Sequence, residues 1–159
     1  MLYVVAWPLL AEADDTALRR LRAQYHPGEA ELIGPHFTLV FGAPADDRQR
    51  LEDGLARLPG QRPFWFVLDR VVRHDNYLYA TPGEGGERLV DLYDAFNPTG
   101  GAEPFEPHIT LGLFASPAQA EQVARIVERQ HLPMHGRVEE LALLARNDHA
   151  LDVVATVRL

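Results

Sequence analysis

The sequence Pro-His-x-Thr-Leu occurs twice in this chain, at residues 35–39 and 107–111. The two histidines, His36 and His108, are 72 residues apart in a chain of 159. With this chain's usage of Pro, His, Thr and Leu, a second copy of those four fixed positions would arise by chance about once in a few hundred chains. The repetition therefore predicts two related halves, each contributing one histidine to a common site.

Apolar spacing predicts the same order of elements in both halves, after a first strand at Leu2–Trp7. Each half should contain a helix, the strand that carries the histidine, a second helix and two further strands. In the first half these elements are expected at Asp14–Tyr25, His36–Phe41, Asp46 to a stop at Pro59, Phe64–Arg73 and Tyr77–Thr81. In the second half they are expected at Glu87–Phe96, His108–Phe114, Ser116–Gln130, Val138–Leu144 and Leu151–Val157.

A single α+β domain over residues 1–159 fits this order, because neither half contains a long linker or a low-complexity tract. We expect two lobes related by a pseudo-two-fold axis, with an internal repeat over about residues 13–81 and 87–158. Antiparallel sheets should line a central cleft, and the helices should lie outside.

The residue types that are missing from the sequence exclude several kinds of chemistry. Cysteine is absent, so disulfides, thiolate nucleophiles and cysteine-based metal sites are excluded. All 15 basic residues are arginine, which excludes a Schiff-base lysine and the P-loop lysine. The single serine, Ser116, precedes Pro117 and a helical pattern, so we interpret it as a helix N-cap and not as a nucleophile.

The net charge of −8 opposes binding of long nucleic acid through a basic patch, because that mode depends on clusters of cations. A nucleotide or an RNA end remains compatible with this charge. The apolar start of the chain has no preceding basic residue and contains Pro8, so we interpret it as a strand and not as a signal peptide. No apolar stretch approaches the roughly 20 residues of a membrane span. We therefore expect a monomeric, cytoplasmic protein without a membrane partner.

Alternation along a strand separates the polar from the apolar residues of each motif. His36 and Thr38 should project to one face, and Phe37, Leu39 and Phe41 should project to the opposite, helix-covered face. The second motif has the same alternation. Two such polar platforms, facing each other across a cleft, would place two imidazoles and two hydroxyls around one small group.

These four side chains suit phosphoryl transfer. An imidazole titrates at about pH 6.5, so His36 and His108 can supply one neutral base and one protonated acid at neutral pH. The hydroxyls of Thr38 and Thr110 can donate hydrogen bonds to the non-bridging oxygens of a phosphoryl group. We expect no metal ion and no cofactor, because the imidazole pair holds both proton-transfer roles.

At residues 32–42 and 104–112 the chain resembles the two-histidine (2H) phosphoesterase superfamily, particularly its bacterial 2′-5′ RNA ligase-like and cyclic phosphodiesterase branch. The resemblance covers essentially the whole chain. It implies that His36 and His108 are catalytic, as general acid and general base, and that Thr38 and Thr110 bind the substrate phosphate. It also implies hydrolysis of 2′,3′-cyclic phosphates at RNA ends or on small nucleotides, or cleavage and joining of 2′-5′ linkages.

Several alternatives remain open. Many members of the family carry an arginine just beyond the second motif, where this chain reads Gly-Leu-Phe, so the cation that anchors substrate is not identified. Other candidate site residues are Arg70, Arg73 and Arg146 for anchoring, Glu103 and Glu106 for orienting His108, and the pairs Tyr77/Tyr79 and Phe64/Phe66 for base stacking. The competing functions are a non-catalytic module that binds nucleotides or RNA ends, and a metal-dependent hydrolase that uses the same histidines.

Overall fold

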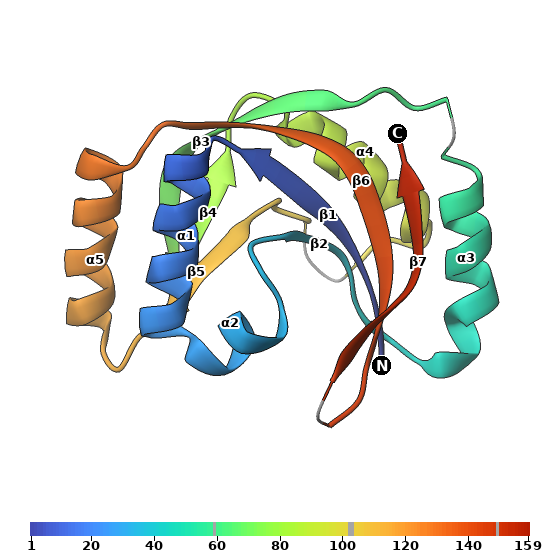
Figure 1. Cartoon of the computed structure of the whole chain (residues 1–159), viewed down its shortest axis with the longest axis horizontal. Helices are drawn as coiled ribbons and strands as arrows, with labels where there is room; N and C mark the ends of the chain where they lie inside the picture. The colour runs from blue at the N-terminus through green and yellow to red at the C-terminus, as the bar shows by residue number, and fades with distance from the viewer. Residues whose placement is uncertain (59, 102–103, 149) are drawn as a thin grey trace.

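The described strands form one seven-stranded antiparallel sheet in the order β1-β2-β5-β4-β3-β6-β7 (Figure 1). The structure is a computed structural model that describes residues 1–58, 60–101, 104–148 and 150–159. The strands are β1 (Leu2–Leu10), β2 (Phe37–Ala43), β3 (Phe64–His74), β4 (Tyr77–Pro82), β5 (Ile109–Leu113), β6 (Met134–Arg146) and β7 (Leu151–Arg158). The helices are α1 (Glu12–Tyr25), α2 (Pro27–Leu32), α3 (Arg48–Ala56), α4 (Gly86–Phe96), α5 (Pro117–Gln130) and the 3-10 helix η1 (Ala45–Asp47).

The expected α+β class with antiparallel strands is confirmed. The strands form one continuous sheet, and not separate sheets, because the long strand β6 pairs with other strands along both of its edges. One edge of β6 pairs with β1, while the other edge pairs first with β3 and then with β7. Since β1 also pairs with β2, the strands from β1 to β6 close into a ring.

The ring closes at one residue pair between β2 and β5, Phe37 with Ile109. Both side chains are 0% exposed and belong to the main hydrophobic core. Each of them directly follows a motif histidine in the sequence. Burial of this pair therefore fixes the two motifs side by side at the point where the ring closes.

Helices cover the sheet in two pairs (Figure 1). α1 and α5 pack against β3, β4 and β5, whereas α3 and α4 pack against β2, β6 and β7. Each pair takes one helix from each half of the chain, so the halves are interleaved in space. The order helix, strand, helix, strand, strand occurs in both halves, and the expected repeat over residues 13–81 and 87–158 stays a prediction. None of the described helices has the length and hydropathy needed to cross a membrane.

The start of α5 follows from its local sequence. The Ser116 hydroxyl accepts a hydrogen bond from the backbone N–H of Gln119 at 3.2 Å, which confirms Ser116 as the N-cap. Pro117 stands in the first turn, where its missing N–H costs no helical hydrogen bond. The helix then buries one apolar face against β3 and β4.

One other helix starts earlier than expected, and the expected end of another lies outside the described residues. α1 begins at Glu12, two residues before its expected start at Asp14, which is followed by Asp15. Both carboxylates lie in the first helical turn, where the helix dipole favours negative charge. α3 ends at Ala56, and the expected stop at Pro59 lies outside the described residues.

A β-bulge in β2 turns Phe41 away from the helices. Regular alternation would place Phe41 on the helix-covered face with Phe37 and Leu39, and that expectation is wrong. Val4 and Val5 on β1 pair with Val40 and Thr38 on β2, so Leu39 is an extra residue between the two pairs. Leu39 and Val40 consequently both enter the core, at 0% and 5% exposure, and the direction of the next side chain is reversed. Phe41 is 56% exposed and lines the cleft.

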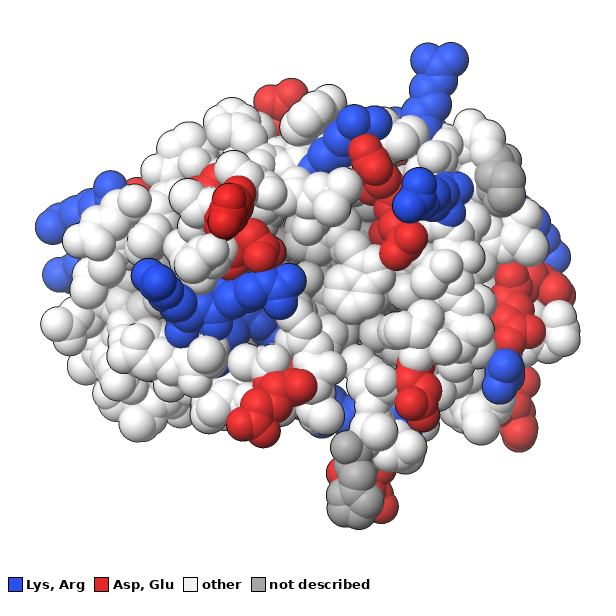
Figure 2. All heavy atoms as spheres, in the orientation of Figure 1, with Lys and Arg blue, Asp and Glu red and all other residues white. Residues whose placement is uncertain are grey.

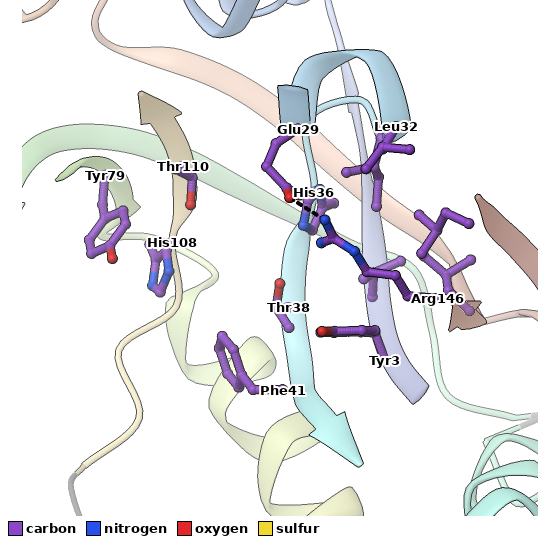
Figure 3. A pocket seen from close by; sticks show the side chains of 14 residues that line it. Tyr3, Glu29, Leu32, His36, Thr38, Phe41, Tyr79, His108, Thr110 and Arg146 are labelled. Carbon is purple, nitrogen blue, oxygen red and sulfur yellow. Dashed lines mark hydrogen bonds and ion pairs between the residues drawn. The ribbon is translucent and has the colours of Figure 1, made fainter. Parts of the chain in front are cut away.

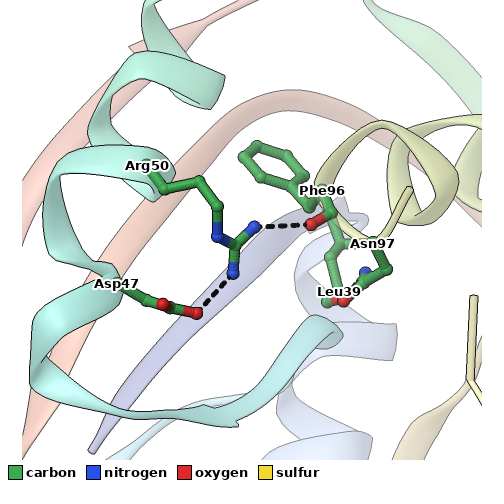
Figure 4. Close-up of polar contacts among 5 residues, drawn as sticks. All are labelled: Leu39, Asp47, Arg50, Phe96 and Asn97. Carbon is green, nitrogen blue, oxygen red and sulfur yellow. Dashed lines mark hydrogen bonds and ion pairs between the residues drawn. The ribbon is translucent and has the colours of Figure 1, made fainter. Parts of the chain in front are cut away.

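The end of α4 holds this bulge (Figure 4). The side-chain amide of Asn97 donates hydrogen bonds to the carbonyls of Leu39 at 2.9 Å and Tyr93 at 2.7 Å. Arg50 on α3 donates a hydrogen bond to the Phe96 carbonyl at 2.9 Å and so fixes the same helix end. A bulge of this kind re-aims a side chain, and here it delivers an aromatic ring to the cleft.

Candidate active site

The two histidine motifs meet beside the pair that joins β2 to β5. Because these strands are antiparallel, each histidine lies on the same side of that pair as the threonine of the other motif. His36, Thr38, His108 and Thr110 all line one cavity of about 230 Å³ (Figure 3). The structure thus brings the four predicted site residues together, while their catalytic and phosphate-binding roles stay predictions.

The same backbone contact orients both imidazole rings. Nδ1 of His36 lies 2.8 Å from the Gly34 carbonyl oxygen, and Nδ1 of His108 lies 2.8 Å from the Glu106 carbonyl oxygen. A carbonyl oxygen can only accept a hydrogen bond, so each Nδ1 carries a proton and Nε2 is left for proton transfer. In both motifs a buried proline, with its fixed φ, separates the histidine from that carbonyl.

The surroundings lower the pKa of both histidines. Burial is the main cause for His36 and lowers its pKa to about 4, with help from the nearby guanidinium of Arg22. Burial also lowers the pKa of His108, although the carbonyl and the carboxylate of Glu106 act in the opposite direction. Both rings are therefore neutral at pH 7 in the free protein. An anion bound between the two rings would favour their protonated forms and would therefore raise both pKa values.

A buried arginine that is absent from the candidates above ties the two motifs together. Arg22 on α1 is 2% exposed, and its guanidinium donates hydrogen bonds to the carbonyls of Thr110 at 2.8 Å and Ile33 at 2.9 Å. Burial lowers the pKa of Arg22, and a guanidinium remains charged even so. The sequence does contain a sign that Arg22 is buried: its spacing from Leu18 and Tyr25 places it on the inward, apolar face of the helix.

Aromatic rings surround the histidines. Tyr79 on β4 stacks on His108 with 4.0 Å between ring centroids, and Phe41 lies on the same ring at 6.4 Å. The rings of Trp7 and His36 are arranged edge to face, with 6.3 Å between their centroids. These rings exclude water from the imidazoles, which is the physical origin of the lowered pKa values.

The two aromatic pairs considered for base stacking lie in different places. Phe64 and Phe66 are buried in the core, at 6% and 0% exposure. Tyr77 and Tyr79 stack on each other with centroids 6.0 Å apart, and Tyr79 lines the first cavity. A second cavity, of about 340 Å³, adjoins the first at Tyr79. Its lining residues are Phe41, Val72, His74, Tyr79, Thr81, Tyr93, Pro104, Phe105, Glu106 and His108.

Of the three candidate arginines, Arg146 reaches the first cavity. It lines that cavity, and its guanidinium pairs with Glu29 at 2.7 Å. Arg70 and Arg73 line neither of the two cavities described above. Just beyond the second motif, Leu113 is 42% exposed, whereas Phe114 is 3% exposed and packs in the core.

The acids expected near the second histidine make one contact that the structure describes. Glu106 contributes its backbone carbonyl to His108, and Glu103 lies outside the described residues. Among the residues that the structure describes, no group of three or more His, Asp or Glu side chains is placed to hold a metal ion. Independence of metal ions stays a prediction for experiment.

Nearly the whole chain is similar to one family and to solved structures of one fold. A family model described as the 2′-5′ RNA ligase superfamily matches residues 9–150. E. coli LigT complexed with 3′-AMP superposes with a TM-score of 0.66 at 21% identity, over 99% of this chain and 96% of that chain. Kluyveromyces marxianus Usb1 superposes with a TM-score of 0.57 at 10% identity, over 99% of this chain and 98% of that chain. No curated protein sequence matches the chain. At these identities the solved structures show the fold.

Proposed function

The chain belongs to the 2′-5′ RNA ligase superfamily of 2H phosphoesterases, and on that premise we propose that it is a metal-independent phosphodiesterase. Its substrates are 2′,3′-cyclic phosphates at RNA ends or on small nucleotides, or 2′-5′ phosphodiester linkages that it cleaves or joins. One observation carries the proposal: the two histidines and two threonines of the repeated motif line one cavity. We also propose that residues 1–159 act as one domain.

In hydrolysis of a cyclic phosphate, Nε2 of His108 accepts a proton from a water molecule as the water oxygen attacks phosphorus. His36 first takes up a proton at Nε2 when the anionic substrate binds, and it then donates that proton to the ribose oxygen whose bond to phosphorus breaks. The hydroxyls of Thr38 and Thr110 donate hydrogen bonds to the non-bridging oxygens, where charge accumulates. The product is a phosphomonoester, and proton exchange with water returns both rings to their starting states.

The ligands of the structural neighbours and the surface charge support a nucleotide as substrate. The solved structures of E. coli LigT include complexes with 3′-AMP and with phosphate, and one of Kluyveromyces marxianus Usb1 contains uridine monophosphate. On the face seen in Figure 2, arginine side chains lie among acidic ones. Pairs such as Arg19 with Asp15 neutralise part of this positive charge, which favours a small substrate over a long nucleic acid.

Chelation tests the proposal against its two competitors. We expect purified protein to hydrolyse adenosine 2′,3′-cyclic phosphate and a 2′-5′-linked dinucleotide at the same rate with and without EDTA, measured by chromatography of the products. Loss of activity in EDTA, restored by a divalent metal ion, would establish a metal-dependent hydrolase. Binding of both compounds without product would establish a non-catalytic module.

The pH dependence of kcat/KM should show an optimum below pH 6.5, the ordinary pKa of histidine. As pH falls, the base becomes protonated and activity is lost; as pH rises, the acid becomes deprotonated and activity is lost. Burial lowers the pKa of both His36 and His108, so both limbs lie on the acid side in the free protein that kcat/KM reports. Rates at constant ionic strength between pH 4 and pH 9 measure this profile, and a plateau extending above pH 8 would contradict it.

A further inference from the structure

The first cavity has one arginine among its described lining residues, and this residue stands apart from the motif strands. Thr38 on β2 pairs with Val5 on β1, and Val5 pairs with Ala142 on β6. Arg146 is four residues further along β6, next to the N-terminal end of β1. At about 5 Å between strands and about 3.3 Å per residue, its backbone is roughly 17 Å from that of Thr38. The guanidinium therefore enters the cavity from its edge.

The position of Arg146 is held on two sides. Its backbone N–H donates a hydrogen bond to the Met1 carbonyl at 2.8 Å, and its carbonyl accepts one from the Met1 amino group at 3.1 Å. Its guanidinium pairs with Glu29 of α2 at 2.7 Å, as Figure 3 shows. The two side chains are 37% and 29% exposed, so an anion in the cavity can reach the pair and compete with the Glu29 carboxylate.

We propose that Arg146 binds a second phosphate of the substrate, the one on the 5′ oxygen of the nucleoside whose cyclic phosphate reacts. This inference rests on the proposed function, since it requires a phosphate between the histidines. A guanidinium suits this role because its fork of N–H donors matches two phosphate oxygens. In a protein with a net charge of −8, binding of a substrate with two phosphate groups needs such a local cation.

The contrast between the two cavities orients the substrate. The second cavity, beyond His108, is lined mainly by aromatic and apolar side chains, and Glu106 is its carboxylate among the described lining residues. An uncharged base fits these walls by stacking, whereas a phosphate is repelled by Glu106. The first cavity extends past His36 to the pair of Glu29 and Arg146. The base should therefore lie on the His108 side and the 5′-phosphate on the Arg146 side.

Two probes that differ by one phosphate test this inference: adenosine 2′,3′-cyclic phosphate with and without a 5′-phosphate. We expect the wild-type kcat/KM to be about tenfold higher or more for the 5′-phosphorylated probe, the size of a charge-assisted contact. Arg146→Gln should remove this preference and change kcat/KM for the other probe less than about threefold. The matched control is Arg158→Gln on β7, whose side chain is 87% exposed outside the cavity, and it should keep the preference.

A second variant should act in the opposite direction. Glu29→Gln removes the charge that competes with phosphate, so it should lower KM for the 5′-phosphorylated probe and increase the preference. Equal losses on both probes in Arg146→Gln would overturn the inference, and so would a wild-type protein without preference. A wild-type protein that hydrolyses neither probe would instead defeat the proposed activity on cyclic phosphates, on which this inference rests.

Discussion

His36→Ala and His108→Ala should each lower kcat/KM for adenosine 2′,3′-cyclic phosphate by about 10³-fold, within the range that a general acid or base supplies. Each ring presents its Nε2 to the cavity from an Nδ1 contact of 2.8 Å to a backbone carbonyl, and alanine removes the proton carrier without a replacement. Steady-state kinetics on the purified variants measure the loss. The double variant should lose little more than either single variant, because the two proton transfers belong to one step.

A surface histidine provides the control for this experiment. His135 is exposed on β6, and His135→Ala should retain wild-type activity. Binding of adenosine 2′-phosphate should change less than about tenfold in His36→Ala and His108→Ala, since Thr38 and Thr110, which we propose to bind the phosphate, remain. Retention of more than a tenth of wild-type activity in either variant would rule out its assigned role.

Arg22→Met should destabilise the protein by about 2–4 kcal/mol, because it removes the hydrogen bonds that the guanidinium donates to one buried and one partly buried carbonyl. Those carbonyls belong to Thr110 in the second motif and to Ile33, which precedes the first. Methionine fills most of the space left by the arginine, so the loss reports the hydrogen bonds more than a cavity. In a chain of this size the expected fall in Tm is roughly 5–15 °C, and thermal unfolding followed by circular dichroism measures it.

Arg19→Met serves as the matched control on the same helix. Arg19 pairs with Asp15 on the surface at 2.7 Å, and its side chain is 59% exposed, so its loss should cost less than about 1 kcal/mol. A melting temperature of Arg22→Met equal to that of Arg19→Met would show that the buried guanidinium is unimportant for stability.

The parts of the fold that depend on short-range pattern could be predicted. Strand alternation and spacing indicated the α+β class, and the cap at Ser116 was evident from the proline that follows it. The convergence of His36 and His108 could be expected because the motif is repeated. Each of these features is encoded within a few neighbouring residues or in the repeat itself.

The remaining parts depend on contacts between distant elements. Phe41 reaches the cleft because of a bulge that Asn97, 58 positions away from Leu39, supports from another helix. Arg22 lies on the inward face of its helix, but its partners on β5 and in the segment before β2 are distant in the sequence. Arg146 enters the cavity because β6 lies beside β1, a pairing that no local pattern announces. Register and tertiary packing decide all three.

The closure of the ring at Phe37 and Ile109 has a consequence for the direction of the reaction. One histidine and one threonine flank this pair on either side, so the centre offers the same set of groups to a phosphate arriving in either sense. By microscopic reversibility, a ring that donates a proton when a bond breaks must accept one when that bond is made. Bond cleavage and bond formation could thus use identical atoms. The orientation of the substrate would then be selected by the unequal surroundings, the ion pair of Glu29 and Arg146 beyond His36 and the second cavity beyond His108.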